Sequence, residues 1–211
     1  MKFLFDLDGT VTQQETLPII ARHFGAEADM AQLTEQAVSG AVPYEQSLRN
    51  RVMMLRDCSV KEVAKLLASV PLYEMIHQFI SEHKAQCVVV TSNLDCWCSS
   101  LIQRLGCQGF CSHAITCDDK LVKVASIIKK ELIVNHFKEQ GEIVVFVGDG
   151  HNDLQAMQHA HIAIAAGLSN PPAPSLIPFA HHIAKDQQSL YNTLITLTSR
   201  HSCLLANKLV Q

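Results

Sequence analysis

Two apolar segments, residues 2–5 and 143–147, each end in an acidic run broken by glycine, and this recurrence constrains the fold. The first run reads DLDGT over residues 6–10, and the second reads GDGHND over residues 148–153. Short apolar runs that stop at glycine are typical of buried strands, so the acidic side chains are expected where strands give way to loops. In open α/β sheets, ligands bind at that edge.

Strand-like and helix-like patterns alternate along the rest of the chain. Further strands are predicted at residues 87–90, 110–116 and 161–165. Helices are predicted at residues 75–83, 95–105, 127–138 and 186–197, and another helix after the second acidic run is predicted to end at Met157. This alternation predicts an α/β fold in which helices cover both faces of a parallel sheet. A rigid loop is expected at residues 170–174, and the tail from Ser199 carries only a weak pattern.

Residues 15–72 keep a helical period throughout, with Leu17, Ile20 and Phe24 as its first members. This stretch predicts a small helical domain inserted after the first strand. We therefore expect an α/β core formed by residues 1–12 and 73–211, and a helical domain formed by residues 13–72.

Composition excludes several classes of protein. The chain has 211 residues, of which 48% are hydrophobic and 18% charged, so it can bury a core and is not disordered as a whole. Its net charge of -3 comes without a basic stripe, which argues against a nucleic-acid partner. No apolar run approaches the roughly 18 residues of a membrane span, and no signal-like segment is present, so a cytoplasmic location is expected.

The chain contains eight cysteines, which we expect to be reduced thiols. Their spacing matches no common zinc motif. Structural zinc is therefore disfavoured, and the enrichment in cysteine has no explanation in the sequence.

Asp6 and Asp8 are two residues apart, so their side chains project to the same side of an extended backbone. Such a pair can supply a nucleophile and a neighbouring acid/base for phosphoryl transfer. The alternative is an Asx turn in which Asp8 caps the next segment.

The second run adds Asp149, Asn152 and Asp153, although one of the last two could simply cap a helix. A third strand-like run ends in the hydroxyl-bearing residues Thr91 and Ser92. Four carboxylates at strand ends repel one another unless a cation is bound, and Mg²⁺ suits such an all-oxygen site.

From residue 2 to about residue 197, the chain resembles the haloacid dehalogenase superfamily of phosphatases, and within it the phosphoserine phosphatase family. The resemblance implies a Rossmann-like three-layer core with a helical cap inserted after the first strand. It implies Asp6 as nucleophile, Asp8 as general acid/base, Thr91 as phosphate ligand and a helix lysine, for which Lys130 fits better than Lys129. It implies Mg²⁺ bound by Asp6, the main-chain carbonyl of Asp8, Asp149 and Asp153.

The inserted segment also resembles the cap of that family. By this resemblance Glu15 meets the substrate ammonium, Arg51 meets its carboxylate, Tyr44 helps to close the site, and Ser92 and Asn152 lie at the substrate. One anion and one cation suit a zwitterionic amino acid, and arginine can bind a carboxylate through two parallel bonds. The alternatives are dipole compensation for Glu15 and a surface charge for Arg51.

Two departures from the family concern the substrate. Thr91-Ser92-Asn93 replaces the usual Ser-Gly-Gly, and residues 116–124 are shorter than the usual hairpin and loop. The leading hypothesis is a Mg²⁺-dependent hydrolysis of the small phosphate ester O-phospho-L-serine. A phosphatase or phosphotransferase for another small phosphate ester remains open, and a non-enzymatic phosphate-binding module is disfavoured because both Asp6 and Asp8 are present. The sequence leaves the oligomeric state open.

Overall fold

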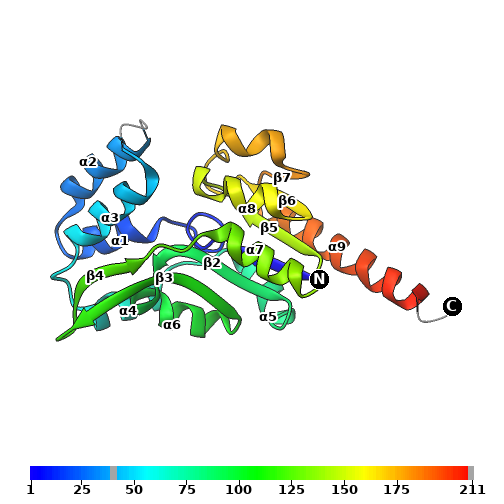
Figure 1. Ribbon diagram of the computed structural model, residues 1–211, viewed down its shortest axis with the longest axis horizontal. Coiled ribbons are helices and arrows are strands. Elements are labelled where there is room, and N and C mark those ends of the chain that lie inside the picture. Colours follow the sequence, from blue (N-terminus) through cyan, green and yellow to red (C-terminus); the bar gives the residue numbers. More distant parts are fainter. Residues whose placement is uncertain (39–41, 209–211) are drawn as a thin grey trace.

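The computed structural model describes residues 1–38 and 42–208, and within them the strands form a single sheet (Figure 1). The strands run in the order β4-β3-β2-β1-β5-β6-β7, and every neighbouring pair is parallel except β3 and β4. Their bounds are Lys2–Phe5 (β1), Cys87–Leu94 (β2), Gln108–Cys117 (β3), Lys120–Ser126 (β4), Val144–Gly148 (β5), Ile162–Ala166 (β6) and His182–Ala184 (β7). The parallel α/β sheet predicted from the alternating pattern is therefore confirmed.

Apolar residues alternate between the two faces of the sheet, so both faces are buried. Phe3 and Phe5 face one side, which α5 (Glu74–Glu82), α6 (Asp95–Leu105) and α9 (Gln187–Lys208) cover. Leu4 faces the other side, which α7 (Lys130–Glu139), α8 (Leu154–His159) and the short 3-10 helix η2 (Pro174–Phe179) cover. The result is a three-layer core with β1 near the middle of the sheet (Figure 1).

Four helices lie between β1 and α5, where the helical insertion was predicted. They are α1 (Thr16–His23), α2 (Glu27–Val38), α3 (Tyr44–Met54) and α4 (Val60–Ala68). Helices α1 to α3 group together at one end of the sheet, whereas α4 packs against α6 (Figure 1). The helical pattern predicted across residues 39–41 lies outside the described residues.

The two chain segments that lead into and out of this insertion pair with each other. Thr12 and Leu72 form an antiparallel bridge, and the Gln13 N–H donates to the Pro71 carbonyl at 3.0 Å. The Ser169 hydroxyl donates to the Gln13 carbonyl at 3.0 Å, which ties this pairing to the loop after β6. The insertion therefore begins and ends at one point on the core.

The main departures from the predicted elements lie at edges. β4 and β7 are edge strands that the pattern did not predict as strands; β4 turns only two residues, Leu121 and Val124, into the core. η2 occupies part of the proline-rich stretch whose beginning was predicted as a loop. Helix α7 begins at Lys130 rather than residue 127, because Lys129 is still extended. Helix α9 continues to Lys208, well beyond the predicted end.

Within residues 1–38 and 42–208, no helix combines the length and the apolar character that crossing a bilayer requires.

Candidate active site

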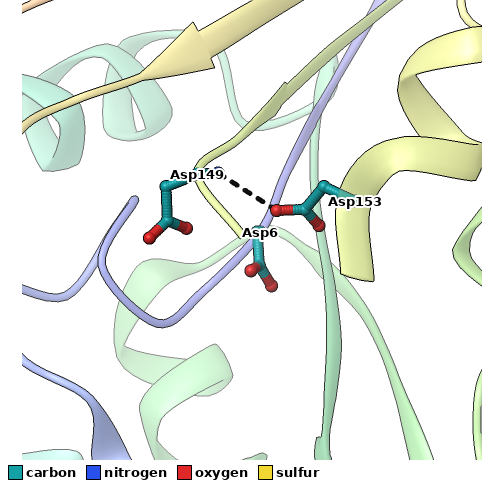
Figure 2. Close-up of side chains that lie close together, drawn as sticks. All are labelled: Asp6, Asp149 and Asp153. Atoms are coloured by element: carbon teal, nitrogen blue, oxygen red, sulfur yellow. Dashed lines mark hydrogen bonds between the residues drawn. The ribbon is translucent and has the colours of Figure 1, made fainter. Parts of the chain in front are cut away.

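Three aspartates converge at the carboxyl ends of two neighbouring strands. Asp6 follows β1, Asp149 follows β5, and Asp153 closes the single 3-10 turn η1 (His151–Asp153). Because β1 and β5 are adjacent and parallel, their ends bring these side chains together. One carboxylate oxygen from each aspartate lies within 4.8 Å of the other two (Figure 2).

Two glycines make room for these carboxylates. Gly9 has a φ of +70°, and a Cβ at this position would lie 2.5 Å from Asp149 Oδ2. A Cβ at Gly148 would overlap the carboxylate of Asp153. The glycines in both acidic runs therefore allow the close approach of backbone and carboxylates, as the sequence pattern suggested.

Lys130 lies beneath the aspartates at the first residue of α7 and is only 2% exposed. Its Nζ lies 2.6 Å from Asp6 Oδ1 and 2.6 Å from Asp153 Oδ1. Burial alone would lower the pKa of Lys130, but attraction to Asp153 and Asp6 holds it well above its usual value. Lys129, the competing candidate, is exposed at the N-cap of the same helix.

Main-chain and hydroxyl donors orient the three carboxylates. Asp153 Oδ2 accepts hydrogen bonds from the N–H groups of Asp149 at 3.0 Å and Gly150 at 3.1 Å, the former drawn in Figure 2. Asp149 Oδ1 accepts from the Thr10 hydroxyl at 3.1 Å. Asp6 Oδ1 accepts from the Leu7 N–H at 2.8 Å. Both protein donors to Asp6 thus meet Oδ1, and neither meets Oδ2.

The cluster carries more negative charge than Lys130 neutralises. Burial, followed by repulsion from Asp153, raises the pKa of Asp6 well above its usual range, although Lys130 opposes the shift. The same two causes raise the pKa of Asp149 to about 7. An all-oxygen donor set with excess negative charge fits a hard divalent cation such as Mg²⁺.

The side chain of Asp8 lies outside this cluster. Its Oδ1 accepts a hydrogen bond from the Thr16 N–H at 2.7 Å, at the start of α1. Burial raises the pKa of Asp8, and the hydrogen bonds from Thr16 partly oppose that rise. The Thr16 hydroxyl in turn accepts from Asn93 Nδ2 at 2.7 Å, so the end of β2 supports the residue that orients Asp8.

A cavity of about 670 Å³ opens above the aspartates, between the strand ends and the insertion. Nine of the predicted site residues line it, namely Asp6, Asp8, Glu15, Tyr44, Arg51, Thr91, Ser92, Asp149 and Asn152. The two remaining predicted residues, Lys130 and Asp153, are buried beneath it. The structure therefore brings all eleven candidates to one place.

Glu15 and Arg51 place an acidic and a basic side chain on the walls formed by the insertion. Burial in the cavity, followed by repulsion from Asp8 and Asp149, raises the pKa of Glu15 to about 8, while Arg51 opposes the shift. Arg51 Nε is buried and has no hydrogen-bond partner among the described residues. Burial also raises the pKa of Tyr44 to about 12, so its hydroxyl stays protonated at neutral pH.

Several residues of the site were not among the sequence candidates. Thr10, Thr16 and Asn93 provide the hydrogen bonds described above, and Thr34 and His151 line the cavity. Thr10 and His151 lie within the acidic runs, and Asn93 follows Thr91-Ser92, so proximity to those motifs was the available signal. Thr34 lies in α2, and no sequence motif marks it.

Comparison with known proteins now identifies the family. The family model described as haloacid dehalogenase-like hydrolase matches residues 3–158. The chain belongs to this family. Among the relatives of this hydrolase is the phosphoserine phosphatase of Methanocaldococcus jannaschii, 31% identical over 175 residues, which cover 77% of the chain and 83% of that protein.

Solved structures also resemble this hydrolase. One, a phospho-aspartyl intermediate analogue of phosphoserine phosphatase, has a TM-score of 0.75 at 28% identity, and the match covers 90% of the chain and 97% of that structure. Another, a substrate-bound phosphoserine phosphatase complex, has a TM-score of 0.74 at 28% identity, and the match covers 89% of the chain and 94% of that structure. The core predicted from the resemblance is thus confirmed as the haloacid dehalogenase fold.

Proposed function

We propose that this hydrolase cleaves O-phospho-L-serine to serine and phosphate through an aspartyl-phosphate intermediate on Asp6. The observation that carries the proposal is the position of Asp6, where the carboxylate cluster meets a cavity that also holds Glu15 and Arg51. The same cavity therefore offers a nucleophile for the phosphate and opposite charges for the two ends of an amino acid. Relatives and solved structures that resemble the chain are named phosphoserine phosphatase, which supports this choice of substrate.

In the first step, Asp6 Oδ2 attacks phosphorus while Oδ1 stays bound to Lys130 and the Leu7 N–H. The bond between phosphorus and the serine oxygen breaks as the new bond to Asp6 forms. Asp8, oriented by Thr16, donates its proton to the departing oxygen so that serine leaves as a neutral alcohol. The raised pKa of Asp8 suits a carboxyl that must carry this proton.

In the second step, water attacks the phosphorus of the aspartyl-phosphate, and Asp8 takes up the proton of that water. Phosphate leaves and Asp6 regains its carboxylate, so no proton is gained or lost by the enzyme over the cycle. The Thr91 hydroxyl, which lines the cavity, and the ammonium of Lys130, which contacts Asp6, would bind phosphate oxygens.

We assign the divalent cation site to Asp6, Asp149, Asp153 and the main-chain carbonyl of Asp8, with Mg²⁺ as the ion. When bound, Mg²⁺ neutralises the negative charge that gathers on the phosphoryl oxygens. A bound cation would also offset the repulsion that Asp153 exerts on Asp6 and Asp149.

We assign substrate selection to the insertion, residues 13–72, acting as a cap. Glu15 would meet the substrate ammonium, and Arg51 the carboxylate. The buried Nε of Arg51, which has no partner among residues 1–38 and 42–208, supports this role because such a donor is costly until it is paired. Tyr44, on the same helix as Arg51, would close the cavity, and Ser92 and Asn152 would contact the substrate from the core.

The test is Mg²⁺-dependent phosphate release from phosphoserine, phosphothreonine, a sugar phosphate and p-nitrophenyl phosphate. We expect the highest kcat/KM with phosphoserine, and no turnover by Asp6→Asn, because an amide is not a competent nucleophile here. Asp29→Asn, at an exposed position of α2, serves as the matched control and should behave like the wild type. Wild-type rates in Asp6→Asn would refute the mechanism, and a preference for another ester would refute the substrate.

A further inference from the structure

The tip of the β3–β4 hairpin is bound to the insertion at a point remote from the catalytic aspartates. Asp119 Oδ2 accepts a hydrogen bond from the Ser59 hydroxyl at 2.6 Å, and Oδ1 accepts from the Lys61 N–H at 3.0 Å. The Asp119 carbonyl accepts from the Val60 N–H at 2.8 Å. Ser59 is the N-cap of α4, so Asp119 joins it in satisfying the free N–H groups of that helix.

Two further hydrogen bonds run along the same side of the hairpin. The Leu121 N–H donates to the carbonyl of Arg56, in the turn between α3 and α4, at 3.0 Å. Arg49 Nη1 donates to the Val124 carbonyl at 2.9 Å. The hairpin therefore holds both α3, through Arg49, and the segment that follows it.

The backbone at the hairpin tip is strained at Asp118 and Asp119, so a side chain kept there is expected to make a contact that glycine could not. Asp118 and Asp119 have φ values of +48° and +62°, a region that favours glycine. Two-residue hairpin turns of this kind usually contain Asn-Gly or Asp-Gly. Aspartate at position 119 keeps the strain, but it supplies the carboxylate that meets α4, whereas exposed Asp118 makes no comparable contact with the insertion.

Helix α3 precedes the attached segment and is itself bound to the hairpin through Arg49, and it carries Tyr44, Leu48 and Arg51 on the cavity wall. The residues that line the cavity include none from the described hairpin, so the hairpin touches the helix that selects the substrate and not the cavity itself. Its contribution to the reaction must then pass through α3.

We propose that Asp119 is a positioning residue that latches the hairpin to α4 and thereby holds Arg51 of α3 at the distance from Asp6 that phosphoserine requires. The inference rests on the proposed function, because it assigns Arg51 to the substrate carboxylate. It adds that a hairpin of the core sheet holds the segment between α3 and α4, so the position of α3 depends on the hairpin tip.

The test compares Asp119→Gly with Asp118→Gly, since both relieve a left-handed residue but only the first removes the latching carboxylate. We expect Asp119→Gly to raise the KM for phosphoserine by about fivefold or more, the change in equilibrium that loss of one helix-terminal contact typically produces, with kcat nearly unchanged. The KM for p-nitrophenyl phosphate, which lacks the amino-acid part, should stay within about twofold of wild type. Asp118→Gly should leave both KM values unchanged.

A conservative variant and a measurement without substrate complete the test. Asp119→Asn keeps an acceptor for the Lys61 N–H and should restore part of the phosphoserine KM. Amide hydrogen exchange over residues 44–68 should be faster in Asp119→Gly than in Asp118→Gly.

Equal effects of the two glycine variants on KM and exchange would overturn the inference while leaving the proposed function intact. Equal losses on both substrates would also overturn it, because the hairpin would then support the catalytic core. If the wild type shows no preference for phosphoserine, the proposed function fails, and the exchange measurement alone decides whether Asp119 holds α3.

Discussion

Replacing Lys130 with methionine tests whether a single buried cation holds two catalytic carboxylates in place. The ammonium of Lys130 lies 2.6 Å from both Asp6 and Asp153, and all three side chains are at most 7% exposed. Removing one partner of a buried ion pair costs about 3–5 kcal/mol, because the remaining charge is left uncompensated. For a chain of this length, that loss corresponds to a fall in Tm of roughly 6–20 °C.

The assay is thermal unfolding of Lys130→Met and wild type in excess chelator, followed by the same measurement with Mg²⁺. Because a bound cation compensates the buried charge of Asp6 and Asp153, Mg²⁺ should reduce the difference in Tm between the two proteins. Lowering the pH should also reduce this difference in Tm, since protonation neutralises the same carboxyl groups.

Lys129→Met is the matched control, because the neighbouring lysine is exposed and should change stability by about 0.5 kcal/mol or less. If Lys130→Met unfolds within about 1 kcal/mol of wild type in chelator, the reasoning is refuted. The reasoning is also refuted if Lys129→Met lowers the stability as much as Lys130→Met does.

Three other predictions concern metal, backbone and substrate. The pKa of Asp149 is about 7 in the folded protein and 3.8 in the unfolded chain, so the metal-free protein should lose stability as pH rises between these values. The increase in Tm caused by Mg²⁺ should grow over the same pH range and then level off. An increase in Tm that does not depend on pH would contradict this prediction. Gly148→Ala should destabilise by about 2 kcal/mol or more in chemical denaturation, because the new Cβ overlaps Asp153, and unchanged stability would count against the close packing. Arg51→Ala should raise the KM for phosphoserine by roughly 10–150-fold and leave that for p-nitrophenyl phosphate near wild type, whereas equal increases would indicate a structural role.

Much of the core followed from local pattern, because the unbroken apolar runs in β1, β2 and β5 reflect burial of both sheet faces. The acidic runs likewise predicted where carboxylates would gather, since strand ends of a parallel sheet share an edge. The edge strand β4 escaped prediction because its mostly exposed sequence lacks a buried run.

Contacts between distant segments could not be predicted. The preference for Lys130 over Lys129 came from the sequence, but its contacts with both Asp6 and Asp153 depend on where α7 begins and how it packs. The bonds from Asn93 to Thr16 and from Ser59 to Asp119 join residues far apart in sequence, and no periodic pattern encodes such pairs.

Because Thr12 and Leu72 form a bridge, the chain leaves the core and returns to it at the same point. Because the two ends of the insertion already meet, the intervening helices can change in length or sequence while β1 keeps its place in the sheet. The acids that perform the chemistry lie on the core side of the bridge, and the charges assigned to the amino-acid part of the substrate lie on the other side. Mutation beyond Thr16, which orients Asp8, can therefore alter which ester is accepted without rebuilding the reaction centre, so substrate choice can evolve largely apart from catalysis.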